Sequence, residues 1–328
     1  MPATAQPPPL LRLRDVSRTF AVKGGGLWAE AATLTAVHKV SLHIDTGEPL
    51  GLVGESGCGK STLGRMIAGL LPPSSGEILL EGQPLYNATG DTLRERAGLV
   101  QMIFQDPFSS LNPRMRVGEA IAEPLLLRRI PRPEREARVR ELLELVGLDA
   151  SQARRYPHEF SGGQRQRVAV ARALVTHPRL VVCDEPVSAL DASVQAQVLN
   201  LLREIRERFA PAYLFISHDL AVVSFLCTRI AVMYLGRIME IGPRDSLLEK
   251  PAHPYTAALL AAMPRHDPTQ RPSGARAGIQ GELPSPLNPP SGCPFHPRCP
   301  DARPQCATEP PPWRELCPAH HVRCHLHA

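Results

Sequence analysis

A nine-residue stretch, GESGCGKST at residues 54–62, constrains this chain more than any other part of its sequence. It matches the pattern G-x-x-x-x-G-K-[ST], in which glycines let backbone N–H groups approach the phosphates of a nucleotide. The lysine is expected to reach the β- and γ-phosphates, and the serine hydroxyl to ligate Mg²⁺. An apolar run typical of a buried strand precedes the loop, and helical spacing follows it. The phosphate loop is therefore predicted to bind nucleotide through Gly54, Glu55, Ser56, Gly57, Cys58, Gly59, Lys60, Ser61 and Thr62.

Short apolar runs alternate with amphipathic segments along most of the chain, which predicts an α/β fold with a mostly parallel sheet covered by helices. At 328 residues and 43% hydrophobic content, the chain is long enough for one large domain or two smaller ones. The strands are expected at 11–20, 33–44, 49–54, 75–82, 98–107, 179–186 and 212–219, with a hairpin at 229–242, and the helices at 128–148, 160–178 and 194–209.

Both ends of the chain differ in composition from this region. Residues 1–10 are proline-rich and lack an apolar signal core, so we expect a disordered lead there. From about residue 251 proline becomes frequent, periodicity fades and cysteines gather, which predicts a domain boundary within residues 250–270. We refer to residues 251–328 as the C-terminal extension.

The composition also excludes several classes of protein. No stretch approaches the roughly 18–20 uninterrupted apolar residues that a membrane span needs. The net charge of +5 is mild for this length and does not indicate nucleic acid as a partner. We therefore expect a cytosolic chain that associates with a membrane only through other proteins.

Polar side chains follow several of the predicted strands, where ligands bind in parallel sheets. Asp184 and Glu185 come directly after an apolar run. An aspartate there can hold Mg²⁺, and the glutamate beside it can polarise the attacking water as a general base. Gln105 and His218 also end strands, where a glutamine can contact the metal and a histidine can donate to the γ-phosphate. The alternatives are a turn or helix cap for the acidic pair and structural roles for the other two.

A second glycine-rich helix start, SGGQ at residues 161–164, has the features of another phosphate-binding site. One nucleotide can contact both the phosphate loop and the SGGQ segment only if the two face each other. Our hypothesis is that Ser161, Gly162, Gly163 and Gln164 serve the nucleotide of a partner subunit. Phe20 ends a strand, where its ring either stacks on adenine or belongs to the core.

With these motifs in the same order, the chain resembles the ATP-binding subunits of ABC transporters over about residues 10–250. Gly54–Thr62 resembles the Walker A motif and Leu180–Glu185 the Walker B motif with its catalytic glutamate. Gln105 matches the Q-loop, His218 the switch histidine, Phe160–Gln164 the signature motif with Phe160 in place of the usual leucine, and Ser188–Asp191 the D-loop.

The resemblance implies an ABC-type nucleotide-binding domain at residues 11–250. It would contain a P-loop parallel core sheet, an antiparallel β subdomain and a helical subdomain at about 106–175. It also implies that ATP and Mg²⁺ are the ligands, that Phe20 contacts adenine, and that Asp191 joins Ser161–Gln164 at the partner's ATP.

The C-terminal extension resembles the tail of dipeptide and oligopeptide importer ATPases, at residues 253–264, 281–300 and 322–326. The form NPPSGC is closer to the F-type ATPase of the pair than to the D-type. This resemblance implies a heterodimer of ATPases on the cytoplasmic face of the inner membrane, beneath two permease subunits and fed by an extracytoplasmic solute-binding protein. Relatives of this tail also serve nickel, glutathione and other small solutes, so the solute stays open.

Four cysteines of the extension match a family pattern similar to iron–sulfur ligands: Cys293, Cys299, Cys306 and Cys324. Thiolates are soft donors suited to iron–sulfur clusters or zinc. We expect a [4Fe–4S] cluster, with zinc and no metal as the alternatives; the lack of a C-x₂-C pair disfavours a zinc ribbon. Cys317 lies outside the pattern.

The sequence disfavours two other function classes, a soluble ABC protein acting on DNA or ribosomes and a regulatory subunit without turnover. Repair-type ABC proteins carry a long coiled coil between the Q-loop and the signature motif, but here Gln105 and Ser161 are separated by 55 residues without sustained heptads. Ribosomal members carry two cassettes, and this chain has one. We therefore expect no nucleic-acid partner. A regulatory subunit without turnover is disfavoured because Glu185 and His218 are both present.

Overall fold

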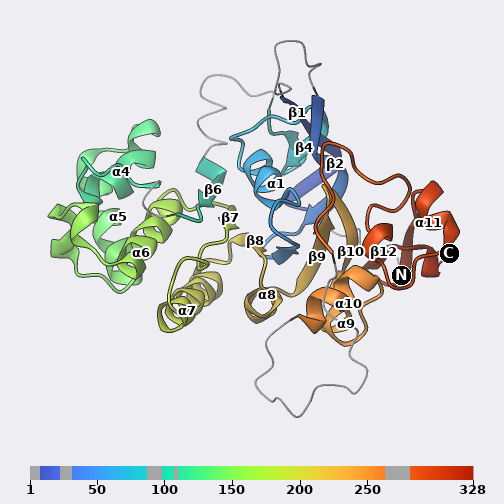
Figure 1. The fold of residues 1–328 in the computed structure, drawn as a ribbon. Helices are drawn as coiled ribbons and strands as arrows, with labels where there is room; N and C mark the ends of the chain where they lie inside the picture. The colour runs from blue at the N-terminus through green and yellow to red at the C-terminus, as the bar shows by residue number, and fades with distance from the viewer. Residues whose placement is uncertain (1–7, 23–31, 87–97, 107–109, 263–280, 328) are drawn as a thin grey trace, which may run out of the picture.

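The computed structural model of the chain describes residues 8–22, 32–86, 98–106, 110–262 and 281–327, which form two β-sheets with helices packed against them (Figure 1). The smaller sheet is antiparallel, in the order β2-β1-β4-β5, with β1 Leu11–Val22, β2 Ala32–Ile44, β4 Ser75–Leu80 and β5 Gln83–Pro84. Within the described ranges, no helix combines the length and the apolar character needed to cross a membrane.

The larger sheet has eight strands in the order β11-β12-β10-β9-β3-β8-β7-β6. Strands β6, β7, β8, β3 and β9 run parallel, whereas β10, β12 and β11 add to the β9 side of the sheet as antiparallel strands. Every residue of β3, β7 and β8 is buried, which explains their continuous apolar sequences. The predicted mostly parallel sheet is confirmed, with bounds β3 Pro49–Val53, β6 Val100–Ile103, β7 Leu180–Asp184, β8 Ala212–Ser217, β9 Arg229–Tyr234, β10 Arg237–Pro243, β11 Trp313–Cys317 and β12 His320–Arg323.

Helices cover the larger sheet on both faces. Helix α1 (Lys60–Ile67) packs between the two sheets, where Leu63 and Met66 share one hydrophobic core with the small sheet. On the opposite face lie α6 (Gly162–Leu174), α7 (Ala192–Phe209) and α8 (Leu220–Leu226). At one end of the molecule, α6 joins a helical lobe with α4 (Val117–Leu127), α5 (Arg132–Leu145) and the 3₁₀ turns η1 (Ala150–Arg154) and η2 (Pro157–Glu159) (Figure 1).

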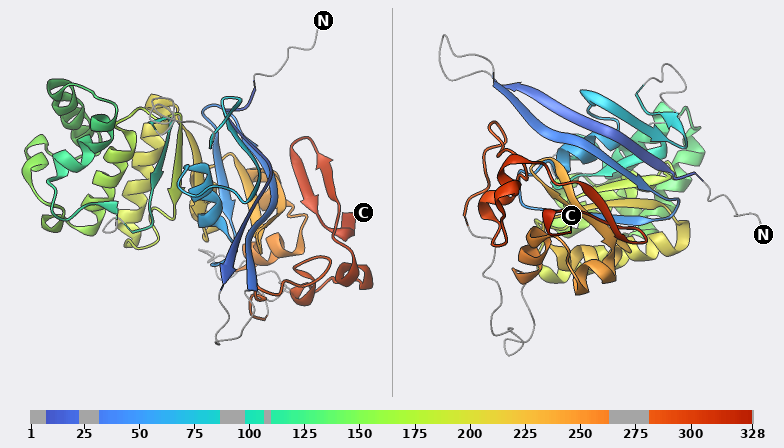
Figure 2. Two further views of the ribbon diagram at one scale, coloured as in Figure 1. Left: turned by 90° about the horizontal axis from the view of Figure 1, so that it is seen from above. Right: turned by 90° about the vertical axis from the view of Figure 1, so that its right-hand side faces the viewer.

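The C-terminal extension lies at the other end of the molecule (Figure 2). It contains α10 (Pro254–Ala261), η4 (His296–Arg298), α11 (Pro304–Thr308), the β11–β12 hairpin and η5 (His325–His327), and it follows α9 (Arg244–Glu249). Strand β12 pairs with β10 of the main sheet, so the hairpin continues that sheet rather than standing apart from it.

A fully buried carboxylate fastens the extension to β10. Glu240 accepts hydrogen bonds from the backbone N–H groups of Ala252 and His253, both at 2.9 Å, and pairs with the His320 Nε2 at 2.8 Å. Burial alone would raise the pKa of Glu240, but these hydrogen bonds hold it below its usual range. The extension is thus held by a charge that has no access to water.

Two expectations about local structure were wrong in detail, and several elements were not predicted. The predicted helix 128–148 begins only at Arg132, because Arg128 closes the preceding helix and Arg129 has a φ of 57°. Strand β6 ends at Ile103 instead of continuing to residue 107. The helices α4, α8, α9, α10 and α11 and the β11–β12 hairpin were not predicted. Residues 1–7 of the lead, residue 107 and residues 263–270 of the predicted boundary lie outside the described residues.

Candidate functional site

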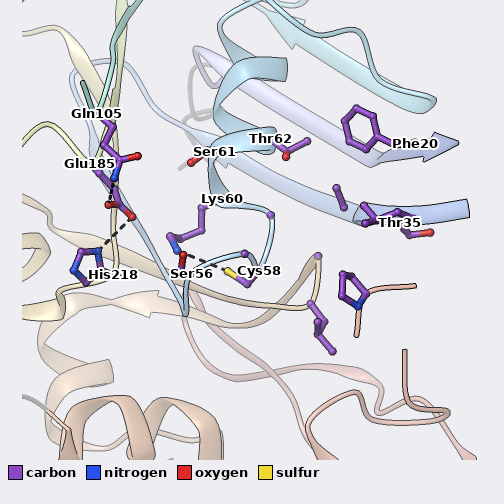
Figure 3. Close-up of a pocket in the computed structure, with 17 residues that line it drawn as sticks. Phe20, Thr35, Ser56, Cys58, Lys60, Ser61, Thr62, Gln105, Glu185 and His218 are labelled. Carbon is purple, nitrogen blue, oxygen red and sulfur yellow. Dashed lines mark hydrogen bonds and ion pairs between the residues drawn. The ribbon is translucent and has the colours of Figure 1, made fainter. Parts of the chain in front are cut away.

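A cavity of about 510 Å³ opens where the parallel strands end, and the phosphate loop forms one of its walls (Figure 3). It brings together eleven of the residues singled out from the sequence: Phe20, Ser56, Gly57, Cys58, Gly59, Lys60, Ser61, Thr62, Gln105, Glu185 and His218. Gly54, Glu55 and Asp184 lie directly behind this lining, as part of the loop or hydrogen-bonded to it.

Glycine is required where the loop passes the backbone of β2. Gly59 has a φ of 105°, and a Cβ placed there would lie 2.1 Å from the carbonyl oxygen of Ala36. No other residue fits this conformation and this space without moving the backbone. The same residue is the N-cap of α1, so the loop leads directly into the first turn of that helix, where N–H groups are free to bind an anion.

Lys60 points into the loop. Its ammonium donates to the carbonyl oxygens of Gly54 at 2.7 Å and Glu55 at 2.9 Å, and its side chain is only 4% exposed. The Cys58 thiol, whose pKa is raised by burial, lies 3.9 Å from the same ammonium. The site therefore holds a positive charge against the loop that is predicted to bind phosphates.

Ser61 and Asp184 form the predicted metal-binding pair. The Ser61 hydroxyl donates to the Asp184 Oδ1 at 2.8 Å, which links the start of α1 to the end of β7. Burial raises the pKa of Asp184, whose side chain is 4% exposed. A hydroxyl and a carboxylate are the hard oxygen donors that Mg²⁺ prefers, and a cation would offset the cost of burying this carboxylate. The donor set fits Mg²⁺.

Glu185 lies at the centre of a three-residue cluster (Figure 3). Its Oε2 accepts a hydrogen bond from the Gln105 Nε2 at 3.0 Å, and its Oε1 lies 3.3 Å from the His218 Nδ1. Its φ of 47° is unusual for a residue with a side chain, and such strain is typical of functional sites. The carboxylate is thereby held beside the phosphate loop, with its two oxygens oriented by residues that follow separate strands, β6 and β8.

Phe20 lines the opposite side of the cavity from Glu185 (Figure 3). It lies on β1 opposite Leu34 of β2, and the Arg18 guanidinium lies 4.8 Å from the centre of its ring. The cavity is therefore aromatic and apolar at one end and carries charged groups at the other. A nucleotide has the same division between its base and its phosphates.

The SGGQ segment and Asp191 do not line this cavity. Ser161 caps α6, where its hydroxyl accepts a hydrogen bond from the Gln164 N–H at 3.3 Å. A Cβ on Gly163 would lie 2.4 Å from a Val194 methyl, so the start of α6 packs closely on α7, whose N-cap is Asp191. The fold thus presents the two helix starts side by side, with Ser161 and Asp191 exposed.

Six residues of the cavity were not predicted: Leu34, Thr35, Ala36, Leu235, Gly236 and Pro286. The sequence does signal a turn at Leu235–Gly236, between the two strands of the expected hairpin. It does not signal that the Gly236 N–H donates to the Cys58 carbonyl at 2.8 Å, which brings this turn to the phosphate loop. Pro286 comes from the C-terminal extension and had no sequence signal.

The four cysteines of the predicted cluster gather within the extension. Burial, together with the neighbouring thiols of Cys306, Cys324 and Cys299, raises the pKa of the Cys293 thiol to about 11. The backbone N–H of Cys293 donates to the Cys306 carbonyl at 2.8 Å. Among the described residues, however, no group of three or more His, Cys, Asp or Glu side chains is arranged to hold a metal ion. Cys317 is exposed on β11.

Comparisons with known proteins agree with this geometry. The sequence matches the family model of ABC transporters over residues 37–188 and that of the oligopeptide/dipeptide transporter C-terminal region over residues 239–306. It is 49% identical to the oligopeptide transport ATP-binding protein AppF of Bacillus subtilis (strain 168), covering 97% of this chain and 98% of that protein. It is 48% identical to the di/tripeptide transport ATP-binding protein DppF of Pseudomonas aeruginosa, covering 96% and 97%.

A solved structure shares the fold. The chain superimposes on a dimeric post-hydrolysis state of the ATP-binding cassette MJ0796 bound to ADP and Pi, with a TM-score of 0.63 and 28% sequence identity. The match covers 71% of this chain and 98% of that one. The sequence relatives therefore extend through the C-terminal extension, whereas the structural match is to the cassette.

Proposed function

This chain belongs to the ATP-binding proteins of ABC transporters, and we propose that it binds and hydrolyses ATP to drive an importer of oligopeptides or dipeptides. One observation carries the proposal. A buried lysine, a serine–aspartate pair and an oriented glutamate from separate elements converge on one cavity, at Lys60, Ser61, Asp184 and Glu185.

Each of these groups has a role in the binding or the hydrolysis of ATP. The loop N–H groups and Lys60 bind the β- and γ-phosphates, while Ser61 and Asp184 would hold Mg²⁺. When bound, the ion neutralises charge that develops on the phosphate oxygens. The Glu185 carboxylate accepts a proton from the attacking water, and His218 and Gln105 keep it turned toward the γ-phosphate. Phe20 contacts the adenine.

A second ATPase subunit completes the catalytic centre in this proposal. Ser161–Gln164 and Asp191 lie outside the chain's own cavity, at the exposed starts of α6 and α7, where a partner's ATP can be reached. The structurally similar cassette MJ0796 is a dimer with ADP and Pi. We propose a heterodimer with the other ATPase of the importer. In mixed dimers, Ser161→Ala should abolish turnover at the partner's site and spare the chain's own site.

The proposed partners are two permease subunits, which would place the chain on the cytoplasmic face of the inner membrane. An extracytoplasmic solute-binding protein would deliver the solute. The relatives are described as oligopeptide, peptide and di/tripeptide transport proteins, which favours peptides over nickel or glutathione. The described lining of the cavity fits a nucleotide and does not indicate which solute is carried.

We further propose that Cys293, Cys299, Cys306 and Cys324 ligate a [4Fe–4S] cluster. Their gathering in one place and the softness of thiolate donors support this assignment. Anaerobically purified protein should be brown and contain equal amounts of iron and acid-labile sulfide. Colourless protein with stoichiometric zinc would favour the alternative.

The function is tested by purifying the chain from membranes with its partners. Two polytopic subunits should copurify in detergent, and ATP hydrolysis by the complex should rise when candidate peptides are added together with their receptor. Copurification of nucleic acid without membrane subunits would instead indicate a soluble ABC protein. If the ATPase rate of the complex is unaffected by every peptide but rises with nickel or glutathione, the transported solute is that compound and not a peptide.

A further inference from the structure

The phosphate loop is fastened to the C-terminal extension at Glu55. The Nη1 of Arg298 donates to both carboxylate oxygens of Glu55 at 3.0 Å. The Tyr255 hydroxyl accepts a hydrogen bond from the Glu55 backbone N–H at 2.9 Å. The side chain and the main chain of one loop residue are therefore both held by the extension.

The two anchoring residues are themselves immobilised. The side chain of Arg298 is 6% exposed, and its Nη2 donates to the Gly281 carbonyl at 3.0 Å. Tyr255 is fully buried in an aromatic cluster with Tyr234 and Phe295, in which the ring centres lie 4.7–5.3 Å apart. Both anchors thus present fixed hydrogen-bonding groups to the loop.

The anchored residue also contacts the proposed phosphate-binding lysine. The carbonyl oxygen of Glu55 accepts a hydrogen bond from the Lys60 ammonium at 2.9 Å. Glu55 is thus held at its N–H by Tyr255, at its carboxylate by Arg298 and at its carbonyl by Lys60. A shift of Tyr255 or Arg298 would move the carbonyl that positions the ammonium.

Pro286 shows that the extension also reaches the nucleotide cavity itself, because it lines the cavity beside Leu235 and Gly236. The extension therefore approaches the nucleotide site from two directions, once behind the loop and once at the cavity wall. No other segment from outside residues 11–250 lines this cavity among the described residues.

We propose that Arg298 and Tyr255 are positioning residues for ATP binding, and that they set the shape of the phosphate loop through Glu55. This inference rests on the proposed function, because it assumes that the loop binds ATP. It assigns to the C-terminal extension a direct influence on nucleotide affinity. The chemistry of hydrolysis, at Glu185, is not part of this influence.

The test compares three variants in the full-length chain: Arg298→Gln, Arg298→Lys and Tyr255→Phe. Losing the paired charge behind the loop should weaken MgATP binding by about ten-fold in Arg298→Gln, and losing one acceptor should weaken it by about three-fold in Tyr255→Phe. Arg298→Lys keeps the charge and should recover part of the affinity. In all three variants, KM should rise while kcat stays within about two-fold. The substitutions are expected to weaken binding of ATP equally in the ground state and in the transition state, which leaves the chemical step unchanged.

Arg314→Gln is the matched control, since it removes an exposed arginine from the same extension on β11. It should bind MgATP as the unmodified chain does. Glu55→Gln combined with Arg298→Gln should be no weaker than Arg298→Gln alone, because the two residues act through one contact. If Arg298 served only the stability of the fold, the substitutions would lower the unfolding temperature, and their effects on MgATP affinity would not show this non-additivity.

Two outcomes separate the inference from the proposed function. If Arg298→Gln and Tyr255→Phe are folded and bind MgATP with unchanged affinity, the inference is wrong and the function stands. Should Arg298→Gln fail to fold, Arg298→Lys and Tyr255→Phe decide in the same way. If Lys60→Ala binds MgATP as tightly as the unmodified chain, the proposed nucleotide site itself is wrong.

Discussion

His253 should make the folded chain sensitive to acid. Its side chain is 1% exposed, and its Nδ1 accepts a hydrogen bond from the Tyr255 N–H at 3.0 Å, which caps helix α10. A protonated ring would lose this acceptor and place a charge among apolar neighbours such as Phe295. Burial lowers the pKa of His253 to about 4, with nearby Glu240 opposing the shift and His327 adding to it.

The magnitude follows from the difference between the folded and unfolded pKa. Below its ordinary pKa of 6.5, the unfolded chain binds a proton at this ring, whereas the folded chain does so only near pH 4. The stability from the neutral ring is therefore present above pH 6.5 and is lost as the pH falls toward 4. The loss amounts to about 2 kcal/mol at pH 5 and about 3 kcal/mol in full.

The assay is urea unfolding of the unmodified chain and of His253→Asn at pH 7, 6 and 5. Asparagine also caps helices through a side-chain oxygen and does not titrate, so this variant should lose about 2 kcal/mol less between pH 7 and pH 5. His158→Asn, which changes an exposed histidine, should keep the pH dependence of the unmodified chain. Equal pH dependence in the chain and in His253→Asn would refute the reasoning.

Three further predictions concern the nucleotide site. Glu185→Gln should lower kcat by at least about 100-fold while MgATP still binds, and a phosphate-release rate within ten-fold of the unmodified chain would exclude Glu185 as the general base. Gly59→Ala should abolish MgATP binding, because its Cβ would lie 2.1 Å from the Ala36 carbonyl at a φ of 105°; normal affinity by calorimetry would contradict this geometry. Phe20→Ala should weaken ATP binding by about ten-fold through lost base stacking and leave tripolyphosphate binding unchanged. Equal losses for both ligands would show that Phe20 does not contact the base.

Much of the cavity could be predicted because its polar residues sit at the ends of apolar runs. Once the sheet is parallel, topology brings the end of β7 beside the phosphate loop, and the Ser61–Asp184 hydrogen bond follows from that arrangement. The role of Gly59 can also be predicted from the sequence, because the loop pattern requires a glycine where the backbone adopts a positive φ. These features depend on local sequence and on one rule of sheet geometry.

Other parts depend on contacts that no local pattern encodes. Helix α4 was missed because Pro124 interrupts its sequence, although the proline is accommodated within the helix. Strand β11 is exposed at every position, so it lacks the alternation that identifies a strand. Tyr255 and Arg298 contact a loop residue that is 200 and 243 positions away, and their surroundings show no periodicity that points to it.

The contact between Glu55 and Arg298 has a consequence for how the chain is made. Because 243 positions separate the two residues, ribosomes working at about 5–20 residues per second would need about 12–50 s between them. During that interval the nascent cassette carries its loop without the arginine that holds it. Tight nucleotide binding would then begin only after Arg298 has been synthesised and placed, and a product released before that point would hold ATP weakly.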